Sequence, residues 1–165
     1  MKKEMTKEEA LHKLAAYCSS AERCTQDIEK KLQMMDLSQE DINQVLLRLQ
    51  QEKFVDDRRY AYAFVSDKFR FNQWGRIKIA YELKKKAIPS AYINEALASI
   101  DEEVYNRLLI TLLRGKQKGL KAKDNRDCYL KLFRFAAGRG FTPVEIARCL
   151  KALGNDEDLY SDDLE

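Results

Sequence analysis

Two groups of basic side chains could bind a phosphate backbone, because cations at this density attract a polyanion. Residues 68–86 hold seven lysines and arginines against one carboxylate, Glu82. Residues 114–139 hold nine against Asp124 and Asp127. From these two stretches the candidate binding residues are Lys68, Arg70, Trp74, Arg76, Lys84, Lys85, Arg114, Lys116, Lys118, Lys121, Lys123, Arg126, Arg134 and Arg139.

Each basic group also has an ordinary interpretation as a solvated helix face. Gly115 and Gly119 favour binding for the second group, because we expect them to place several of its lysines in a flexible loop that can follow phosphates. In the first group, Phe69, Phe71 and Trp74 alternate with cations, as in a surface that stacks single-stranded bases. Aromatic side chains more often belong to a core, and Phe69 is expected to face inward. Trp74 is therefore the aromatic candidate.

Patterns typical of catalysis are absent from the sequence, which has no phosphate-binding glycine loop, nucleophile elbow or H-E-x-x-H motif. Asp56 and Asp57 resemble a metal-binding pair, but we interpret one of them as a helix N-cap. The four cysteines include no C-x-x-C pair and His12 is the single histidine. We expect free thiols, with Cys149 in the core, and neither metal nor cofactor. The sequence predicts a binding protein rather than an enzyme.

The net charge of +3 conceals an uneven distribution. Residues 1–53 carry −1, residues 54–103 carry +1, residues 104–153 carry +9, and residues 154–165 carry −6. A phosphate-rich partner is attracted to the third segment and repelled by the acidic tail, which we expect to be disordered. No apolar run approaches the roughly 20 residues that a membrane span needs, and no signal peptide is present, so we expect a cytoplasmic protein.

The elements that position these residues are predicted from the apolar pattern, whose spacings of three and four indicate helices. One apolar set recurs twice: Ile28, Leu32, Leu37, Ile42, Val45, Leu46 and Leu49; then Ile79, Leu83, Ile88, Ile93, Ala96, Leu97 and Ile100; then Leu132, Ala136, Phe141, Ile146, Cys149, Leu150 and Leu153. The sequence therefore predicts an all-α fold of three tandem three-helix repeats, residues 1–53, 54–103 and 104–153, in an elongated, curved array.

Within each repeat, we expect a longer first helix and then two helices joined by a tight break. The first helices are predicted at residues 7–19, 58–71 and 105–113. Ser38 with Asp41, and Thr142 with Glu145, have the spacing of a capping box. Pro143 suits the first position of a helix, and Gly140 suits a helix end.

The chain resembles the RecX regulatory family over about residues 8–153. The resemblance rests on Phe54-Val55-Asp56-Asp57-Arg58-Arg59-Tyr60-Ala61, Phe64-Val65, Gly75, Ile79, Glu82-Leu83, Lys86 and Ile88, then on Arg139-Gly140-Phe141 and Ile146. It implies the tandem three-helix fold and a non-enzymatic modulator of the RecA recombinase, acting in DNA recombination, repair and the SOS response. Such a protein lies in the groove of the RecA filament on single-stranded DNA. It restrains recombinase activity and ATP turnover by blocking filament extension or promoting disassembly.

Two positions depart from that family. Ser20-Ala21 stands where the family often has a basic pair, which argues against a phosphate contact in the first repeat. Ala87 replaces the family's glycine at the second break, so we expect that helix end to be less sharply turned.

Two other functions stay open. A general DNA-binding protein, independent of RecA, would use residues 128–138 and 143–153 as a helix-turn-helix-like pair, in which the second helix offers a groove only Arg148 and Lys151. A protein adaptor would use its lysines for solvation alone. The leading interpretation takes the RecA filament and single-stranded DNA as partners, with duplex DNA as a further possibility. It also expects no membrane contact and a monomer.

Overall fold

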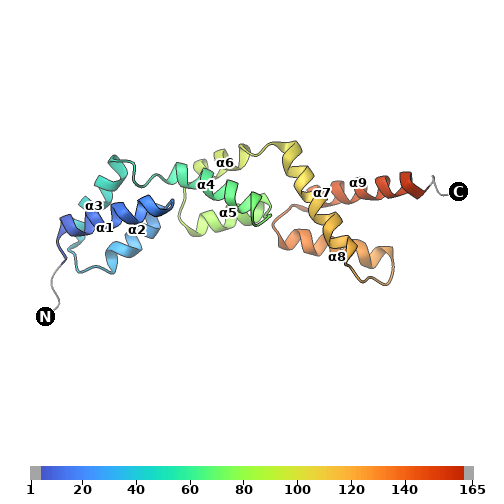
Figure 1. Cartoon of the computed structure of the whole chain (residues 1–165), viewed down its shortest axis with the longest axis horizontal. Coiled ribbons are helices and arrows are strands. Elements are labelled where there is room, and N and C mark those ends of the chain that lie inside the picture. The colour runs from blue at the N-terminus through green and yellow to red at the C-terminus, as the bar shows by residue number, and fades with distance from the viewer. Residues whose placement is uncertain (1–4, 162–165) are drawn as a thin grey trace. The chain divides into compact units, whose positions relative to one another are not determined.

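The structure, a computed structural model, describes the backbone of residues 5–161 and the side chains of residues 5–154. Within that part the chain is helical, with no strand, and the predicted all-α class is confirmed. The helices are α1 (Lys7–Ser20), α2 (Thr25–Gln33), α3 (Gln39–Gln51), α4 (Asp57–Arg70), α5 (Arg76–Lys85), α6 (Ser90–Ala98), α7 (Glu102–Lys118), α8 (Asn125–Gly138) and α9 (Pro143–Ser161) (Figure 1).

The helices follow the predicted order of three triplets: α1–α3, α4–α6 and α7–α9. Every residue of the three recurring apolar sets is buried or half-buried. Ile28, Ile79 and Leu132, which head the three sets, are at most 3% exposed. Burial of one such aliphatic side chain is worth about 1.5–3 kcal/mol, so the shared stripe stabilises each triplet and explains the repeat.

Side-chain caps begin the helices where the sequence places them. Ser38 Oγ accepts from the Asp41 N–H at 3.1 Å. The Thr142 and Glu145 side chains each accept from the other's backbone N–H, which completes the predicted capping box before Pro143. Asp56 accepts from the Arg59 N–H at 3.0 Å, so the acidic pair does contain an N-cap, as predicted.

The two breaks after α5 and α8 share one geometry. Ala87 has φ 59° and Gly140 has φ 98°, and in both breaks the next residue's N–H bonds a carbonyl five residues back, Ile88 to Leu83 and Phe141 to Ala136. The expectation of a less sharply turned end at Ala87 is therefore wrong. An L-residue in this region costs about 1–2 kcal/mol, which the burial of Ile88 offsets.

Helix α7 extends beyond its predicted end. It runs to Lys118 and contains Gly115, so Arg114, Lys116 and Lys118 lie on a helix and the predicted loop is wrong for them. A glycine inside a helix costs about 1 kcal/mol, and the buried Leu109 and Leu113 in the preceding turns stabilise the helix by more than that.

The acidic segment 154–165, predicted to be disordered, begins inside α9. The backbone of residues 154–161 continues this helix. The side chains after Gly154 and all of residues 162–165 lie outside the described part of the chain.

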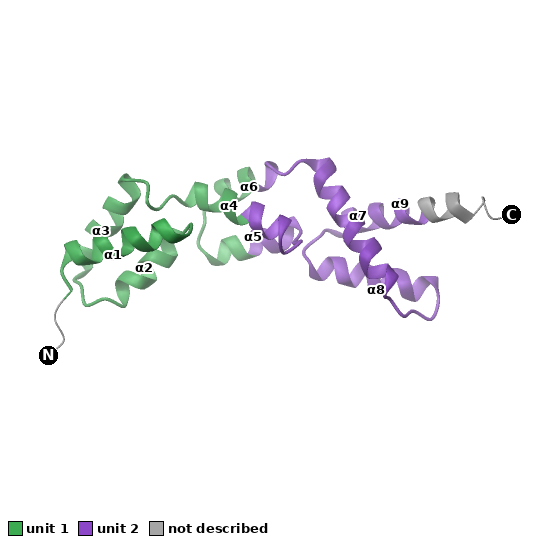
Figure 2. Ribbon diagram, in the orientation of Figure 1, with its two compact units in different colours: residues 1–64, 82–96 green, residues 65–81, 97–165 purple. Residues whose placement is uncertain are grey.

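The chain forms two compact units (Figure 2). Unit 1 comprises residues 1–64 and 82–96, and unit 2 comprises residues 65–81 and 97–165. Unit 1 thus contains the first triplet, unit 2 contains the third, and the middle triplet is divided between them. The repeat boundaries at residues 53 and 103 follow helix order rather than compactness and stay a prediction.

Each unit has its own core. In unit 1, Leu14, Ile28, Leu32 and Leu49 are at most 1% exposed and belong to one apolar cluster. In unit 2, the fully buried Tyr105 ring lies 5.7 Å from Phe69 and 5.3 Å from Phe141, measured between centroids. Phe69 faces inward, as predicted.

Candidate nucleic-acid interface

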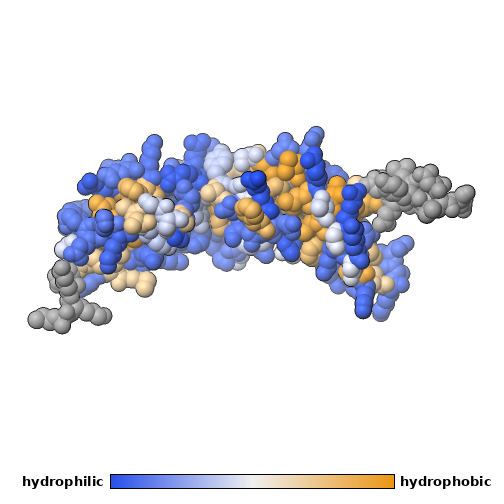
Figure 3. Space-filling model, viewed as in Figure 1, coloured by the Kyte–Doolittle hydropathy of each residue, from blue (hydrophilic) through white to orange (hydrophobic). Residues whose placement is uncertain are grey.

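Unit 2 carries most of the predicted basic residues on α7, α8 and the loop between them. Figure 3 shows hydrophilic side chains over the visible face of α8 and the end of α7. The exposed members are Arg114, Lys116, Lys118, Lys121, Lys123, Arg126 and Arg134, and Arg139 is half-buried. The exposed members therefore form a positively charged surface that solvent reaches, while Arg139 also donates to the carbonyl of Asn72 at 2.9 Å.

One aromatic ring brings two of these cations together. The Lys116 Nζ lies 5.1 Å, and the Arg139 Cζ 5.3 Å, from the centroid of Phe135. A cation over an aromatic face is held by the quadrupole of the ring. Two positive charges, one from α7 and one from the end of α8, thus concentrate at one place.

The loop between α7 and α8 is held to α8 by hydrogen bonds. Lys131 Nζ donates to the carbonyl of Lys121 at 2.8 Å and pairs with Asp127 at 3.1 Å. The Lys123 N–H donates to the Asp127 carboxylate at 3.1 Å. The hydrogen bond from this N–H is the main cause that lowers the pKa of Asp127, and the hydrogen bond from Lys131 is the second. Lys121 and Lys123 are therefore in a loop, as predicted, but one tied to the helix.

The first basic group surrounds Trp74. The Lys68 and Lys78 ammonium groups lie 5.0 and 4.6 Å from the Trp74 ring centroid, and the ring is half-buried. A base stacking on Trp74 competes with these cations. Arg70, in the last turn of α4, is exposed.

Lys84 and Lys85 lie in unit 1, in the last turn of α5, and both are exposed. Lys85 pairs with Glu82 at 3.4 Å. Their neighbour Lys86, outside the candidate set, donates to Asp27 at 2.8 Å.

Arg76 is engaged within unit 2. Its guanidinium lies 2.7 Å from Glu102 and 3.7 Å from Glu145, and its Cζ stands 4.0 Å over the Tyr105 ring. Its backbone N–H donates to the Tyr105 hydroxyl, which in turn donates to Glu145 at 3.3 Å. Burial, above all, raises the pKa of Tyr105, so this hydroxyl stays protonated. These contacts give Arg76 a structural role that the sequence prediction missed.

The same contacts have a counterpart between the first two repeats. The Thr25 N–H donates to Asp57 at 2.8 Å, and Thr25 begins α2 as Arg76 begins α5. Tyr60 and Tyr105 each stand four residues after the aspartate that caps their helix, Asp56 and Asp101. In each joint the acidic residue after the cap, Asp57 or Glu102, contacts the first residue of the preceding repeat's middle helix, and this repeated acidic position is the sequence signal that could have revealed both joints.

Catalytic and metal chemistry find no support in the described residues. They contain no group of three His, Cys, Asp or Glu side chains able to hold a metal ion. Asp56 and Asp57 are both occupied in helix-end hydrogen bonds. Burial, above all, raises the pKa of Cys24 to about 11 and also raises that of the buried Cys149, so neither is a reactive thiolate.

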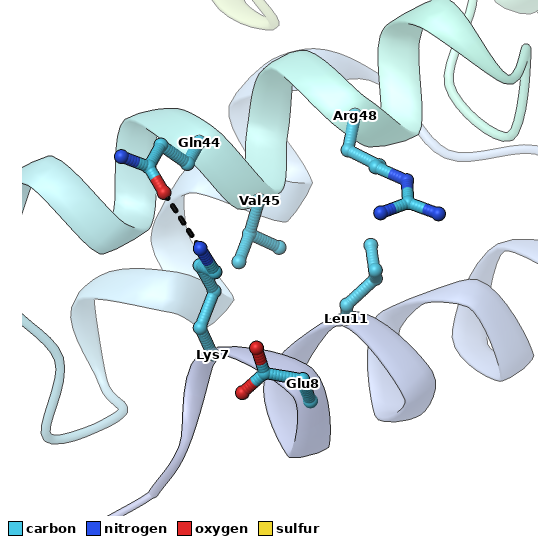
Figure 4. A pocket seen from close by; sticks show the side chains of 6 residues that line it. All are labelled: Lys7, Glu8, Leu11, Gln44, Val45 and Arg48. Carbon is cyan, nitrogen blue, oxygen red and sulfur yellow. Dashed lines mark hydrogen bonds between the residues drawn. The ribbon is translucent and has the colours of Figure 1, made fainter.

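A small pocket of about 190 Å³ lies between α1 and α3 (Figure 4). Lys7 donates to Gln44 at 2.8 Å at one end, and Leu11 and Val45 form its apolar part. Its lining includes two cations, Lys7 and Arg48, and one carboxylate, Glu8. This mixed lining has no arrangement of nucleophile and base.

No helix in the described residues is both long enough and apolar enough to cross a membrane.

Comparisons with known proteins agree with the geometry. A family model described as the second three-helix domain of RecX matches residues 56–97. The regulatory protein RecX of Chlorobium phaeobacteroides is 32% identical over 129 residues, which span 78% of this chain and 83% of the relative. The regulatory protein RecX of Chlorobaculum tepidum is 30% identical over 139 residues, 84% of each chain.

Other relatives are longer. The chain spans 56% of the length of the RecX proteins of Streptococcus sanguinis and Streptococcus gordonii, at 28% and 29% identity. A crystal structure of RecX from Lactobacillus salivarius has the same fold, with a TM-score of 0.83 over 90% of this chain and 96% of that chain, at 20% identity. The chain therefore belongs to the RecX family, whose members are regulatory proteins rather than enzymes.

Proposed function

We propose that the chain regulates the RecA recombinase by binding the RecA filament on single-stranded DNA. The observation that carries this proposal is the exposed basic surface of α7, α8 and their loop in a member of the RecX family. Bound there, the chain inhibits recombinase and ATPase activity by blocking filament extension or promoting disassembly. A monomer in the cytoplasm is sufficient for either of these two mechanisms.

The proposal divides the candidate residues by their contacts. Lys118, Lys121, Lys123 and Arg126 are exposed near the loop that Lys131 holds to α8, so their side chains meet phosphates with little reordering of the backbone. Arg134 and Arg139 extend the same positive surface along α8, and Arg114 and Lys116 extend it along α7. Lys68, Arg70, Trp74, Lys84 and Lys85 form further contacts to DNA or to RecA.

The direct test is ATP hydrolysis by RecA from the same organism, stimulated by single-stranded DNA, with increasing amounts of this protein. Inhibition well below one protein per RecA is expected, because a bound regulator that stops extension or starts disassembly affects many subunits. Unchanged hydrolysis at stoichiometric amounts, with DNA binding intact, contradicts the proposal.

A general DNA-binding function is the second candidate. It is favoured by the tight turn between α8 and α9, which gives the pair a helix-turn-helix-like order, and by the exposed Arg148 and Lys151 on α9. Two cations without a neighbouring Asn or Gln provide little base readout. Sequence-specific protection of a duplex without RecA would support this candidate over the first.

A further inference from the structure

A pocket of about 280 Å³ opens at the end of unit 2, where α7, α8 and α9 meet. Leu132, Leu150 and Leu153 form its apolar floor, and the Gln117 and Asn125 amides add hydrogen-bond donors and acceptors. Cys128, Tyr129 and Gly154 complete the lining. The pocket therefore combines apolar side chains with amide groups in its lining.

The side of this pocket is an exposed aromatic ring. Tyr129 is 44% exposed, and its ring lies 6.2 Å from that of Phe133 with an interplanar angle of 28°. Phe133 follows one helical turn later on α8, so it supports the Tyr129 ring from the same face of the helix. A ring held in this way offers a stacking surface to a base at small entropic cost.

Cations that could bind phosphates are close in sequence to the residues that line the pocket. Arg126 lies between the lining residues Asn125 and Cys128, and Lys121 and Lys123 lie on the preceding loop. Among the carboxylates whose side chains the structure describes near the pocket, Asp127 binds Lys131 and the Lys123 N–H, and Asp124 caps α8. The α7–α8 loop therefore places positive charge next to the pocket, while the side chains of the acidic segment after Gly154 lie outside the described part of the chain.

The repeat argues against another three-helix repeat as the occupant. By the register of the apolar sets, Tyr129 corresponds to Thr25 and Arg76. Those two residues begin their helices, and their N–H groups bind the following repeat, at Asp57 and at Tyr105. Tyr129 is instead the fifth residue of α8, where the N–H is used by the helix itself. The hydrogen bond that this position makes in the two joints therefore has no counterpart at Tyr129.

We propose that this pocket binds one unstacked base of single-stranded DNA, which stacks on Tyr129 while the adjoining phosphates contact Lys121, Lys123 and Arg126. The inference rests on the proposed function and gives it a base-binding position that the basic clusters alone do not supply. Recognition is through the face of the base, so it tolerates any sequence.

The test compares two oligonucleotides with equal numbers of phosphates, a thymidine 20-mer and a 20-mer of abasic sites, bound to the full chain at fixed salt. Stacking of one base supports a preference of about tenfold for the thymidine strand. Tyr129→Leu is expected to reduce that preference at least about fivefold while leaving abasic binding unchanged. Tyr129→Phe, which keeps the stacking ring, should retain it.

The matched control is Tyr81→Leu, which removes a tyrosine that is 61% exposed on α5. It should leave the preference unchanged. If Tyr129→Leu also leaves the preference unchanged, the base pocket is overturned; loss of RecA binding in that variant would then identify a protein as the occupant. If the unmodified chain binds neither strand and does not inhibit RecA, the proposed function itself fails.

Discussion

The amide N–H of Gly75 donates to the carbonyl of Arg139 at 2.7 Å, so the start of α5 is bound backbone to backbone to the turn between α8 and α9. The Ile77 N–H adds a second such bond, to Gly140 at 3.0 Å. A Cβ on Gly75 would overlap the backbone oxygen of Gly140. Gly75 and Arg139-Gly140-Phe141, which are among the residues that carry the family resemblance, therefore meet at one close contact.

Gly75→Ala is expected to lower the free energy of unfolding by about 2 kcal/mol, because the new methyl group meets backbone that cannot rotate away. Urea titration followed by circular dichroism measures this change.

Gly115→Ala is the matched control. Gly115 lies inside α7, and a Cβ there meets nothing within 4 Å, so alanine should raise stability by about 0.5–1 kcal/mol. Equal destabilisation by both substitutions would show that the Gly75 contact does not constrain the fold.

The ion pair of Asp27 and Lys86 joins repeats one and two inside unit 1. The Asp27 side chain is 19% exposed and that of Lys86 is 38% exposed, so solvent screens part of the attraction. Asp27→Asn should therefore cost about 1 kcal/mol at pH 7, as measured by urea unfolding. Glu29→Gln, on the same helix, is the control and should cost less.

The pair also predicts a pH dependence. Burial works to raise the pKa of Asp27, but its bonds to Lys86 and Cys24 prevail and lower it below 3.8. The stabilisation is thus fully present at a pH above the pKa that Asp27 has in the unfolded chain. It is lost as the pH falls through the pKa that Asp27 has in the folded chain. Asp27 also raises the pKa of Lys86 above 10.5, so at the alkaline end the loss comes only above that value. A difference between Asp27→Asn and the unmodified chain that does not decrease as the pH falls below the ordinary range of aspartate would contradict this account.

Local order was predictable from the sequence because its causes lie within a few residues. The apolar stripe headed by Ile28, Ile79 and Leu132 became the buried face, and the caps at Ser38 and Thr142 formed where their spacing indicated. These features depend on helical geometry alone.

The joints between repeats were not predictable, because their partners are distant in sequence. Arg76 was assigned to the binding surface since its neighbours are basic, yet Glu102 and Glu145, which engage it, lie 26 and 69 residues further along. Ala87 adopts a glycine-like φ because tertiary burial of Ile88 outweighs local preference. The register of the apolar sets places Tyr129 at the position of Thr25 and Arg76, outside the recurring stripe, but the sequence did not show that Tyr129 lines a pocket.

The basic loop predicts a specific salt dependence. Combined Lys121→Gln, Lys123→Gln and Arg126→Gln should weaken binding to single-stranded DNA. Each phosphate that no longer meets a cation should reduce the slope of log affinity against log salt by about 0.7. Fluorescence anisotropy across a salt series measures both quantities.

The control for this triple variant has the same change in charge. Lys13, Lys30 and Lys53 are exposed residues of the first repeat, and their combined change to Gln should leave the slope unaltered. Equal effects of the two triple variants would mean that net charge, rather than the α7–α8 loop, determines binding.

Arg76 and Arg70 separate structural from binding cations. Arg76→Gln removes the interactions with Glu102 and Tyr105 and leaves Glu145, 12% exposed, without its cation, so it should lower the free energy of unfolding by about 2 kcal/mol. The salt slope for single-stranded DNA should not change. Arg70→Gln changes an exposed residue, so it should alter the free energy of unfolding by no more than about 0.5 kcal/mol. It should reduce the salt slope by about 0.7. If Arg76→Gln reduces the salt slope and leaves the free energy of unfolding unchanged, Arg76 belongs to the DNA-binding residues.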